Sequence, residues 1–500
     1  MTLSNRAHGF LACIAGALSV FAFAPFNQPI FALISAASLY ILCYTTRPFL
    51  LGWCFGLGYF GAGVSWVFVS IHYHGGMGII AAALMTFLFT AGLGMLFALQ
   101  IGLYRQLFKP HSALGFIAVW VVFEWVRSWL FTGFPWLLTG YAFIDTPLAQ
   151  WAPIGGVWLV SLMAISVAVL TAEATLRRRP SLLILPLSIF VLSGFIPNDW
   201  VKKTEETRSI TLIQPNLAQQ TKWDVEQVDR HIKQLINLTA MAPATQLIIW
   251  PETAIPKLVS TAKAQLTPLT RLLDEQNTVL ISGFPRRVFS ESSNRALYHN
   301  AIGTLNGPEP LTVYDKQRLV PFGEYLPFEH QLRNLIAFFA LPMSNFSLPK
   351  GTQQGLNAQG LNIASAICYE IAYPELVRHQ TRNASVILTV SNDTWFGGSH
   401  GPDQHFEIAR MRALENGRPV IRSTNDGITG FIDHEGQVIS TAPRFTEAML
   451  TADLTMVTGQ TPYQRVGISL TLLMATLMLT IALLRARSFK QYTKTGRAGL

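Results

Sequence analysis

The stretch IASAICYE, residues 363–370, joins an apolar run to a reactive side chain. The uncharged residues Ile363 to Ile367 are typical of a strand that is buried on both faces of a sheet. Cys368 follows at the expected strand end, where a rigid sheet can aim a side chain into a cleft. The stretch therefore predicts a sheet-containing domain with Cys368 as a candidate nucleophile. Because a single cysteine at a strand end is more commonly a buried apolar residue, this role requires partners.

Two further buried-type strands end in side chains that nucleophilic catalysis needs. LIIWPE (residues 247–252) places Glu252, and VYDK (residues 313–316) places Lys316. A thiol with an ordinary pKa of about 8.5 needs a base such as Glu252 to accept its proton. The Lys316 ammonium can stabilise the thiolate and an oxyanion, with the backbone N–H of Tyr369 as a second donor. Taken singly, Glu252 is explained equally well as a turn carboxylate, and Lys316 as an ordinary surface lysine. Only their combination favours catalysis.

The remaining cysteines and histidines indicate neither a disulfide nor a metal site. Cys13, Cys43 and Cys54 lie in apolar sequence, where a small hydrophobic side chain is the usual explanation. Cys368 has no cysteine partner in the polar part of the chain, so no structural disulfide is expected there. His72 and His74 are too few ligands for a metal, and no motif indicates a cofactor. We therefore expect chemistry performed by side chains alone.

Composition indicates a membrane protein. Hydrophobic residues make up 50% of the 500 residues and charged residues only 13%, compared with about 25% charged residues in an average soluble domain. The net charge of +9 does not indicate nucleic acid, because the basic residues flank apolar runs and form no aromatic-interleaved patch. Eight apolar runs are candidate membrane spans: Phe10 to Phe26, Pro29 to Tyr44, Leu50 to Ile71, Ile79 to Leu103, Ala113 to Leu130, Ile154 to Ala174, Leu182 to Phe195 and Val466 to Leu484.

The basic residues between these runs predict the orientation. Those expected on one face are Arg6, Arg47, Arg105, the triplet Arg177, Arg178 and Arg179, and the tail after Leu484. Lys and Arg accumulate on the cytoplasmic side, so the large polar segment should project outward. The first run is interpreted as a retained span, since cleaving it as a signal peptide would spoil this alternation. The predicted domains are a seven-helix membrane domain (residues 1–197), an outward catalytic domain (198–465), and an eighth span with a basic cytoplasmic tail (466–500).

Short strands separated by turn signals fill the polar segment. At least two helical stretches are also expected, one of them from Gln404 to Asn416. Strands interleaved with helices predict an α/β or α+β domain. The expected strands are Ser209 to Ile213, Leu247 to Trp250, Val279 to Gly283, Ala301 to Leu305, Ile363 to Ile367, Val386 to Val390 and Val420 to Ser423.

Three motifs carry a resemblance to a known family. WPET (residues 250–253), YDKQRLVPFGE (residues 314–324) and ICYE (residues 367–370) resemble the triad segments of the nitrilase superfamily, in the same chain order. That resemblance implies a Glu-Lys-Cys triad on a four-layer αββα sandwich. With eight flanking spans, the chain is most similar to the apolipoprotein N-acyltransferase family, and the similarity covers essentially its whole length.

The resemblance also implies roles for individual residues. It makes Cys368 the nucleophile, Glu252 the proton acceptor and Lys316 the essential lysine. It further assigns supporting roles to Glu324 beside the lysine and to Tyr369 and Glu370 beside the cysteine, and a place near the entrance, in contact with substrate, to Trp223. Each supporting residue keeps a structural alternative: a solvated or ion-paired carboxylate for Glu324 and Glu370, a backbone role for Tyr369, and packing for Trp223.

The function implied by the resemblance is acyl transfer. A fatty acyl chain would pass from a membrane phospholipid, through a thioester on Cys368, to the α-amino group of diacylglyceryl-cysteine in apolipoproteins. The expected location is the bacterial inner membrane, with the catalytic domain in the periplasm. The alternatives are a membrane-tethered amidase or hydrolase of the same superfamily, and a transporter with Glu124 and Arg127 as pathway residues. Those two residues are otherwise a structural ion pair or a lipid headgroup site.

Two polar groups after the third motif are expected to be structural. Ser391 to Trp395 follow a strand and are rich in Asn and Asp, which suffices to explain a turn. Arg410, Arg412 and Arg418 lie on or just after the predicted helix. No catalytic role is assigned to either group.

Overall fold

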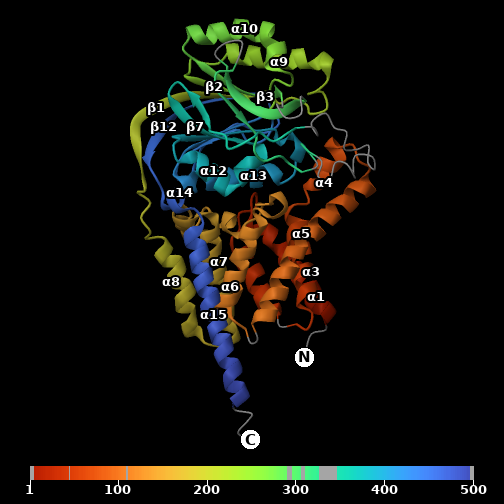
Figure 1. The fold of residues 1–500 in the computed structure, drawn as a ribbon, viewed down its shortest axis with the longest axis vertical. Helices are drawn as coiled ribbons and strands as arrows, with labels where there is room; N and C mark the ends of the chain where they lie inside the picture. Colours follow the sequence, from red (N-terminus) through yellow and green to blue (C-terminus); the bar gives the residue numbers. More distant parts are fainter. Residues whose placement is uncertain are drawn as a thin grey trace. The chain divides into compact units, whose positions relative to one another are not determined.

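The computed structural model describes residues 5–43, 45–108, 111–289, 295–305, 310–321, 323–325 and 346–495 (Figure 1). Tyr44, the predicted end of the second span, lies outside the described residues. The chain divides into two compact units. The helical unit comprises Met1–Phe68, Ile79–Asn198 and Val466–Leu500. The sheet unit comprises Val69–Gly78 and Asp199–Arg465, so part of a predicted outward connection clusters with the sheets.

Apolar helices form the helical unit. Its longer helices are α1 (Asn5–Leu18), α2 (Ile30–Leu42), α3 (Pro48–Gly63), α5 (Ile79–Leu107), α6 (Ala113–Arg127), α7 (Ala152–Leu176), α8 (Ile184–Ser193) and α15 (Ser469–Thr495). Short 3₁₀ segments connect several of them: Ser19–Ala22, Leu130–Thr132, Thr139–Phe143, Pro147–Trp151 and Pro180–Leu183. Two short helices, α4 (Val67–Val69) and α14 (Pro462–Val466), include the positions along the chain at which one unit ends and the other begins.

The prediction of eight membrane spans is confirmed only in part. A helix occupies each predicted range. Among the described residues, however, three helices are long and apolar enough to cross a membrane: Ile79–Leu107, Pro147–Leu176 and Ser469–Ser488. A fourth counts if Pro48–Gly63 and Val67–His74 form one span. The others are short; α6 has 15 residues, a length of about 22 Å against the roughly 30 Å of a hydrocarbon core.

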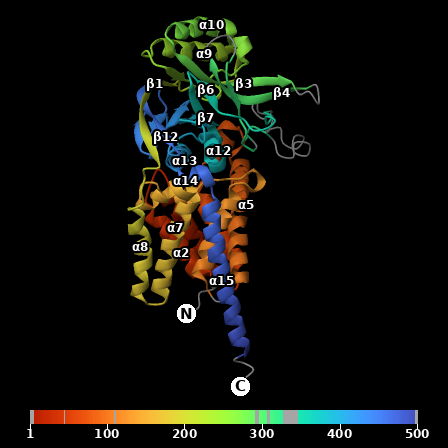
Figure 2. The same cartoon turned by 60° about the vertical axis from the view of Figure 1, so that its left-hand side comes forward.

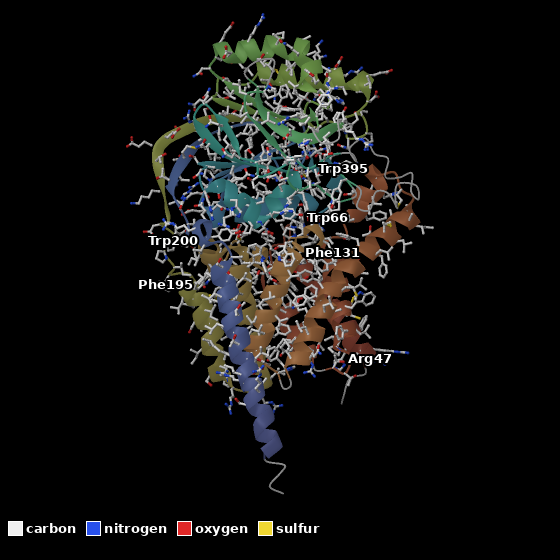
Figure 3. All side chains as sticks on the ribbon, in the orientation of Figure 1. Arg47, Trp66, Phe131, Phe195, Trp200 and Trp395 are labelled. Carbon is white, nitrogen blue, oxygen red and sulfur yellow. The ribbon has the colours of Figure 1, made fainter. Side chains whose placement is uncertain are left out.

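The helices of the helical unit differ in how much of their surface is buried, as expected for a helix bundle in an apolar solvent. The most apolar 18-residue window of Pro147–Leu176 is 83% buried, whereas the corresponding windows of Ile79–Leu107 and Ser469–Ser488 are 17% buried. Large apolar side chains are exposed: Ile80 on α5 is 86% exposed, and Phe131, which is labelled in Figure 3, is 91% exposed. Exposed apolar surface of this kind needs a non-aqueous neighbour such as lipid.

The buried charged residues of α6 do not form the ion pair that was one of the predicted alternatives. The Glu124 carboxylate accepts hydrogen bonds from the backbone N of Thr139 at 2.9 Å and its Oγ1 at 2.6 Å. Arg127 donates to the carbonyl of Leu137 at 3.0 Å. Within the described part of the chain, no salt bridge joins the two residues. Both instead hold residues 137–139 against α6, which favours a structural role.

Two six-stranded sheets form the sheet unit. The first has the order β12-β1-β2-β3-β4-β5 and contains β1 (Val201–Gln214), β2 (Leu247–Ile249), β3 (Val279–Phe289), β4 (Ala296–Leu305), β5 (Val313–Asp315) and β12 (Ala448–Gly459). The second has the order β11-β10-β9-β8-β7-β6 and contains β6 (Leu356–Ala358), β7 (Leu361–Ile367), β8 (Val386–Ser391), β9 (Val420–Thr424), β10 (Gly430–Ile432) and β11 (Val438–Thr441).

Pairing within each sheet is mixed. β1, β2 and β3 are parallel, as are β7, β8 and β9, so their carboxyl ends meet at one edge of each sheet. β12 closes the first sheet antiparallel to β1, with Ile210 opposite Ala452, and Figure 2 shows the two strands side by side. Six of the seven predicted strands lie within these elements, and the seventh, Leu247 to Trp250, extends one residue beyond β2; β6, β10, β11 and β12 were not expected.

Helices cover the outer face of each sheet. On the first, α9 (Val225–Ala240) and α10 (Val259–Glu275) share an apolar core with β2 and β3 that includes Trp250. On the second, α12 (Pro374–Thr381) and α13 (Gly401–Asn416) contact β7 and β9 (Figure 1). Between the sheets, Ile210 and Ile281 belong to the same buried cluster as Ile363 and Leu388. This is the αββα arrangement that the resemblance implied, and the predicted helix lies within α13.

Gly283 on β3 allows the segment that carries Glu252 to pass close to the sheet. A Cβ at position 283 would lie 2.4 Å from the backbone N of Thr253 and 2.9 Å from Cα of Glu252. Because both are backbone atoms, no side-chain rotation relieves the contact. Position 283 therefore requires a glycine, because the segment that carries the candidate site residue Glu252 passes directly beside it.

We expect Gly283→Ala to destabilise the sheet unit. Overpacking of this kind costs about 1–3 kcal/mol, which lowers a thermal midpoint by about 2–12 °C in a domain of this size. Thermal unfolding of the detergent-solubilised full chain measures the change. Gly398→Ala is the control, because a Cβ there meets nothing within 4 Å. Equal midpoints for the two variants would contradict the close approach.

Candidate active site

Three strand ends of the sheet unit bring the predicted triad together. Glu252 follows β2, Lys316 follows β5 and Cys368 follows β7. The Lys316 Nζ lies 3.3 Å from Glu252 Oε1 and 2.8 Å from Glu324 Oε1. The charges of Glu252 and Lys316 both act on the Cys368 thiol. The structure thus places the four polar residues that the motifs supplied around one centre.

Lys316 is a buried cation held between two carboxylates. Its side chain is 1% exposed, and burial alone would lower the pKa of the ammonium. The carboxylates of Glu324 and Glu252 more than offset burial, so the pKa of Lys316 lies above its ordinary value. The Glu324 carboxylate is fixed in turn by the backbone N of Val320, which donates to Oε2 at 2.9 Å. Lys316 is therefore positively charged throughout the physiological pH range.

The Glu252 carboxylate is oriented by neutral donors as well as by Lys316. Asn300 Nδ2 donates to Glu252 Oε1 at 2.8 Å and, at the same distance, to Glu324 Oε1. The backbone N of Asn392 donates to Glu252 Oε2 at 2.9 Å. Lys222 Nζ donates to the backbone carbonyl of Glu252 at 3.0 Å. Both oxygens of the candidate base therefore have fixed partners.

Cys368 combines a strained backbone with a protonated thiol. Its φ is +52°, a left-handed conformation that non-glycine residues rarely adopt. Burial, followed by the charge of Glu252, raises the pKa of the thiol to about 12, while Lys316 opposes the shift. At neutral pH the resting side chain is therefore a thiol and needs a base at the moment of attack.

Glu370 ties the segment after Lys316 to the strand that ends at Cys368. Its fully buried carboxylate accepts from the backbone N of Gln317 at 2.6 Å and of Ile367 at 2.8 Å. Tyr314 Oη, on β5, donates to both of its oxygens at 3.0 Å. Burial raises the pKa of Glu370 to about 7. The residue holds two strand ends in register, which supports the structural alternative for its role.

The other two predicted supporting residues make apolar contacts. The Tyr369 ring packs edge-on against Tyr373, with ring centroids 5.2 Å apart. Trp223, next to Lys222, packs against a small cluster that contains Leu319 and Phe346. Tyr325 and Trp395 border the same cluster. These contacts are compatible with packing and with an apolar entrance.

Sequence reasoning missed three polar residues of this centre. The prediction placed Asn300 just before a strand, yet it lies inside β4. Because asparagine is uncommon in strands, its presence there could have pointed to a functional role. Lys222 is 2% exposed and gave no signal beyond its neighbour Trp223. His405 lies on α13 and contacts the carbonyl of Cys368. The turn that follows β8 was expected to be structural, but its Asn392 contacts Glu252.

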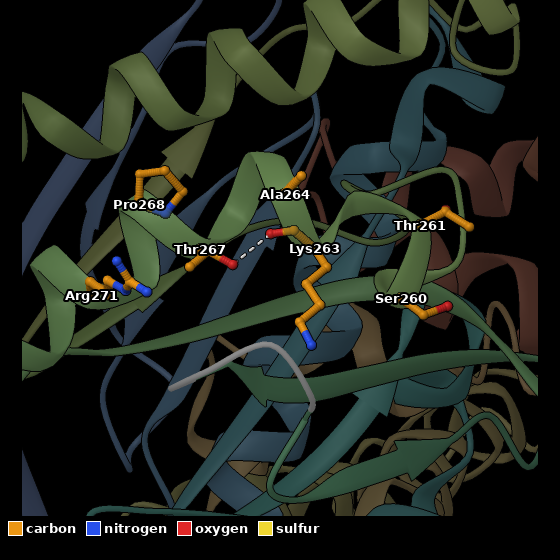
Figure 4. A pocket seen from close by; sticks show the side chains of 7 residues that line it. All are labelled: Ser260, Thr261, Lys263, Ala264, Thr267, Pro268 and Arg271. Carbon is orange, nitrogen blue, oxygen red and sulfur yellow. Dashed lines mark hydrogen bonds between the residues drawn. The ribbon is translucent and has the colours of Figure 1, made fainter.

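Other potential sites lie away from this centre or lack ligands. Within the ranges that the structure describes, no group of three or more His, Cys, Asp or Glu residues is arranged to hold a metal ion. A pocket on the outer helix α10 contains none of the candidate catalytic residues (Figure 4). Its lining residues are Ser260, Thr261, Lys263, Ala264, Thr267, Pro268 and Arg271.

Comparison with known proteins identifies the family. Residues 15–170 match the apolipoprotein N-acyltransferase N-terminal domain, and residues 209–463 match the carbon-nitrogen hydrolase family. The apolipoprotein N-acyltransferase of Pseudomonas aeruginosa PAO1 is 41% identical over 471 residues, which cover 91% of each chain. That of Azotobacter vinelandii is 38% identical and covers 96% of this chain and 95% of its own. That of Vibrio vulnificus is 39% identical and covers 91% and 92%, respectively. The chain therefore belongs to the apolipoprotein N-acyltransferase family.

Proposed function

We propose that this enzyme transfers a fatty acyl chain from a membrane phospholipid, through a thioester on Cys368, to the α-amino group of diacylglyceryl-cysteine in apolipoproteins. Membership of the family supports the acyl-transfer reaction. The observation that carries the catalytic assignment is the Lys316 ammonium, held 3.3 Å from Glu252 and 2.8 Å from Glu324, whose charge acts on the half-buried Cys368 thiol. In this proposal Cys368 is the nucleophile, Glu252 the base, and Lys316 the electrostatic stabiliser.

The first half-reaction forms the thioester. Because the pKa of Cys368 is raised to about 12, Glu252 accepts the thiol proton while Sγ attacks the ester carbonyl of the phospholipid. Lys316 and the backbone N–H of Tyr369 stabilise the resulting oxyanion. When the tetrahedral intermediate collapses, the C–O bond breaks. The lysophospholipid leaves with the proton that Glu252 returns to its alkoxide.

The second half-reaction forms the amide. The acceptor amine, whose ordinary pKa is about 7.7–8.0, attacks the thioester carbonyl in its neutral form, and Glu252 accepts its extra proton. The same donors stabilise the second oxyanion. The C–S bond then breaks, and the thiolate recovers a proton from Glu252. Glu324 supports both halves by keeping Lys316 charged and in place.

We also propose where each part of the enzyme works. Residues 1–197 and 466–500 would provide eight membrane spans, and residues 198–465 the catalytic domain on the periplasmic side of the inner membrane. Alternating basic connections and apolar helices support this topology, and both substrates carry acyl chains that must reach the site from the bilayer. The supporting roles of Tyr369 and Glu370 are to place the oxyanion donor and the strand ends, and that of Trp223 is to line the entrance.

A thioester on Cys368 is the first expected outcome. Incubation with acyl-labelled phospholipid, without acceptor, should label the full-length enzyme in a form that hydroxylamine removes. Cys368→Ala should abolish the label, because the nucleophile is gone. Cys54→Ala is the matched control and should keep it, since that thiol belongs to the helical unit. Persistent label on Cys368→Ala would refute the assignment.

The same preparation separates the transferase from its nearest rival. The match of residues 209–463 to carbon-nitrogen hydrolases supports an alternative in which water resolves the thioester. Adding a diacylglyceryl-cysteine peptide should convert the label into acylated peptide. Release of free fatty acid without acylated peptide would instead identify a hydrolase.

Glu252→Gln should separate the ionisation of the thiol from base catalysis. Because the charge of Glu252 raises the pKa of Cys368, its removal lowers that pKa and increases the thiolate fraction at a given pH. Alkylation of Cys368 by iodoacetamide should then be unchanged or faster, whereas acyl transfer should fall by about 10²–10⁴-fold because the base is lost.

The pH dependence of alkylation provides an internal check on that result. With its pKa near 12, the wild-type thiol should react faster with each pH unit through pH 10, where an ordinary thiol of pKa about 8.5 has levelled off. In Glu252→Gln the rise should shift to lower pH. If alkylation and transfer fall together in the variant, Glu252 acts on the fold and not as the base.

A further inference from the structure

A buried polar chain leads from the core of the sheet unit to the nucleophile. His405 on α13 is completely buried, and its Nε2 lies 3.1 Å from the backbone carbonyl of Cys368. Its Nδ1 lies 3.0 Å from Nη2 of Arg422 on β9 and 3.1 Å from Oδ1 of Asp393. Arg422 donates to Asp393 Oδ2 at 2.7 Å. None of these three side chains was assigned a role from the sequence.

The partners decide which nitrogen of His405 carries the hydrogen. A carbonyl oxygen only accepts, so Nε2 must donate to Cys368. Burial and the neighbouring Arg422 lower the pKa of His405, which leaves the ring neutral. Nδ1 then accepts from Arg422 Nη2, and Asp393 Oδ1, although 3.1 Å from Nδ1, restrains the ring only through Arg422. Although burial opposes it, Arg422 holds the pKa of Asp393 well below its usual range, so Asp393 and Arg422 form a charged pair that fixes the ring.

Peptide geometry transmits this hydrogen bond to the reacting region. The carbonyl of Cys368 and the N–H of Tyr369 belong to one planar trans peptide, in which they point in opposite directions. Whatever fixes the carbonyl therefore fixes the direction of the N–H. This carbonyl needs a restraint, because a φ of +52° at Cys368 is unfavourable for a non-glycine residue and persists only when its surroundings hold it.

We propose that His405 is a positioning residue that aims the Tyr369 N–H at the oxyanion by holding the Cys368 carbonyl. This inference rests on the proposed function, in which that N–H stabilises both tetrahedral intermediates. A core residue chosen only to fill space would be apolar, because burying an imidazole requires hydrogen-bonding partners for both nitrogens. Asp393 and Arg422 act through His405 and keep its donor directed at the carbonyl.

Two reactions of Cys368 separate positioning from general damage. Acylation by a p-nitrophenyl ester passes through an oxyanion, whereas alkylation by iodoacetamide displaces iodide and does not. His405→Met removes the donor at similar volume. It should slow acylation by at least about tenfold, and by no more than the roughly 10²–10³-fold that follows loss of an oxyanion donor itself. Alkylation should change less than about threefold.

Matched variants test the source of the effect. His405→Gln retains an N–H near the Nε2 position. On a logarithmic scale, it should recover at least half of the acylation rate that His405→Met loses. His405→Asn keeps polarity but is too short to reach the carbonyl, and should resemble His405→Met. His231→Met, a substitution of another buried histidine on α9, should leave both reactions unchanged.

The outcomes distinguish this inference from the proposed function. If wild-type enzyme forms no acyl-Cys368 with phospholipid, the proposed function fails. If wild type is acylated but His405→Met and His405→Asn acylate at the wild-type rate, the positioning role alone is overturned. Equal losses of acylation and alkylation in both variants, with lowered thermal midpoints, would also overturn it, because a damaged fold would then account for the effect.

Discussion

The contact on which the rest of the site depends is the buried ammonium of Lys316 between the carboxylates of Glu252 and Glu324. A lysine enclosed by protein is costly unless its charge is balanced, and each carboxylate would be costly without the lysine. Asn300 joins the same oxygens, so four side chains from different segments form one mutually dependent cluster. The cluster orients Glu252, whose charge acts on a thiol that is itself neutral at neutral pH. The acid–base chemistry that we propose for Cys368 depends on this arrangement.

Two further restraints keep the cluster in register with Cys368. Glu370 connects the backbone after β5 with the end of β7, and His405 contacts the carbonyl of Cys368 from α13. The first restraint acts across the two sheets and the second acts from the helix layer outside one of them. The αββα sandwich therefore does more than present three strand ends, because its layers constrain the backbone around Cys368 from opposite sides.

The strand ends were predictable from the sequence because apolar runs such as LIIW and IASAI end abruptly at polar residues. The triad and the sandwich followed from these runs together with the family resemblance. Asn300 was missed because the predicted strand began at Ala301, whereas β4 begins at Ala296. His405 was missed because its helix is buried all round, so no apolar face distinguishes a packing residue from a polar one. Helix lengths were not predictable from composition, because the apolar run Ala113 to Leu130 continues after α6 has ended at Arg127, so eight complete spans stay a prediction.

Because β1 pairs with β12, the two ends of the chain segment that forms the sheets lie side by side. Val201 lies opposite Gly459, so the first and last strands of the unit are neighbours although more than half of the chain separates them. During synthesis β1 emerges long before its partner, and the first sheet lacks one edge until residues 448–459 have been made. Closing so long a loop makes formation of the sheet a late, non-local event. Glu252, which follows the strand next to β1, therefore gains its final support only when nearly the whole chain has been translated.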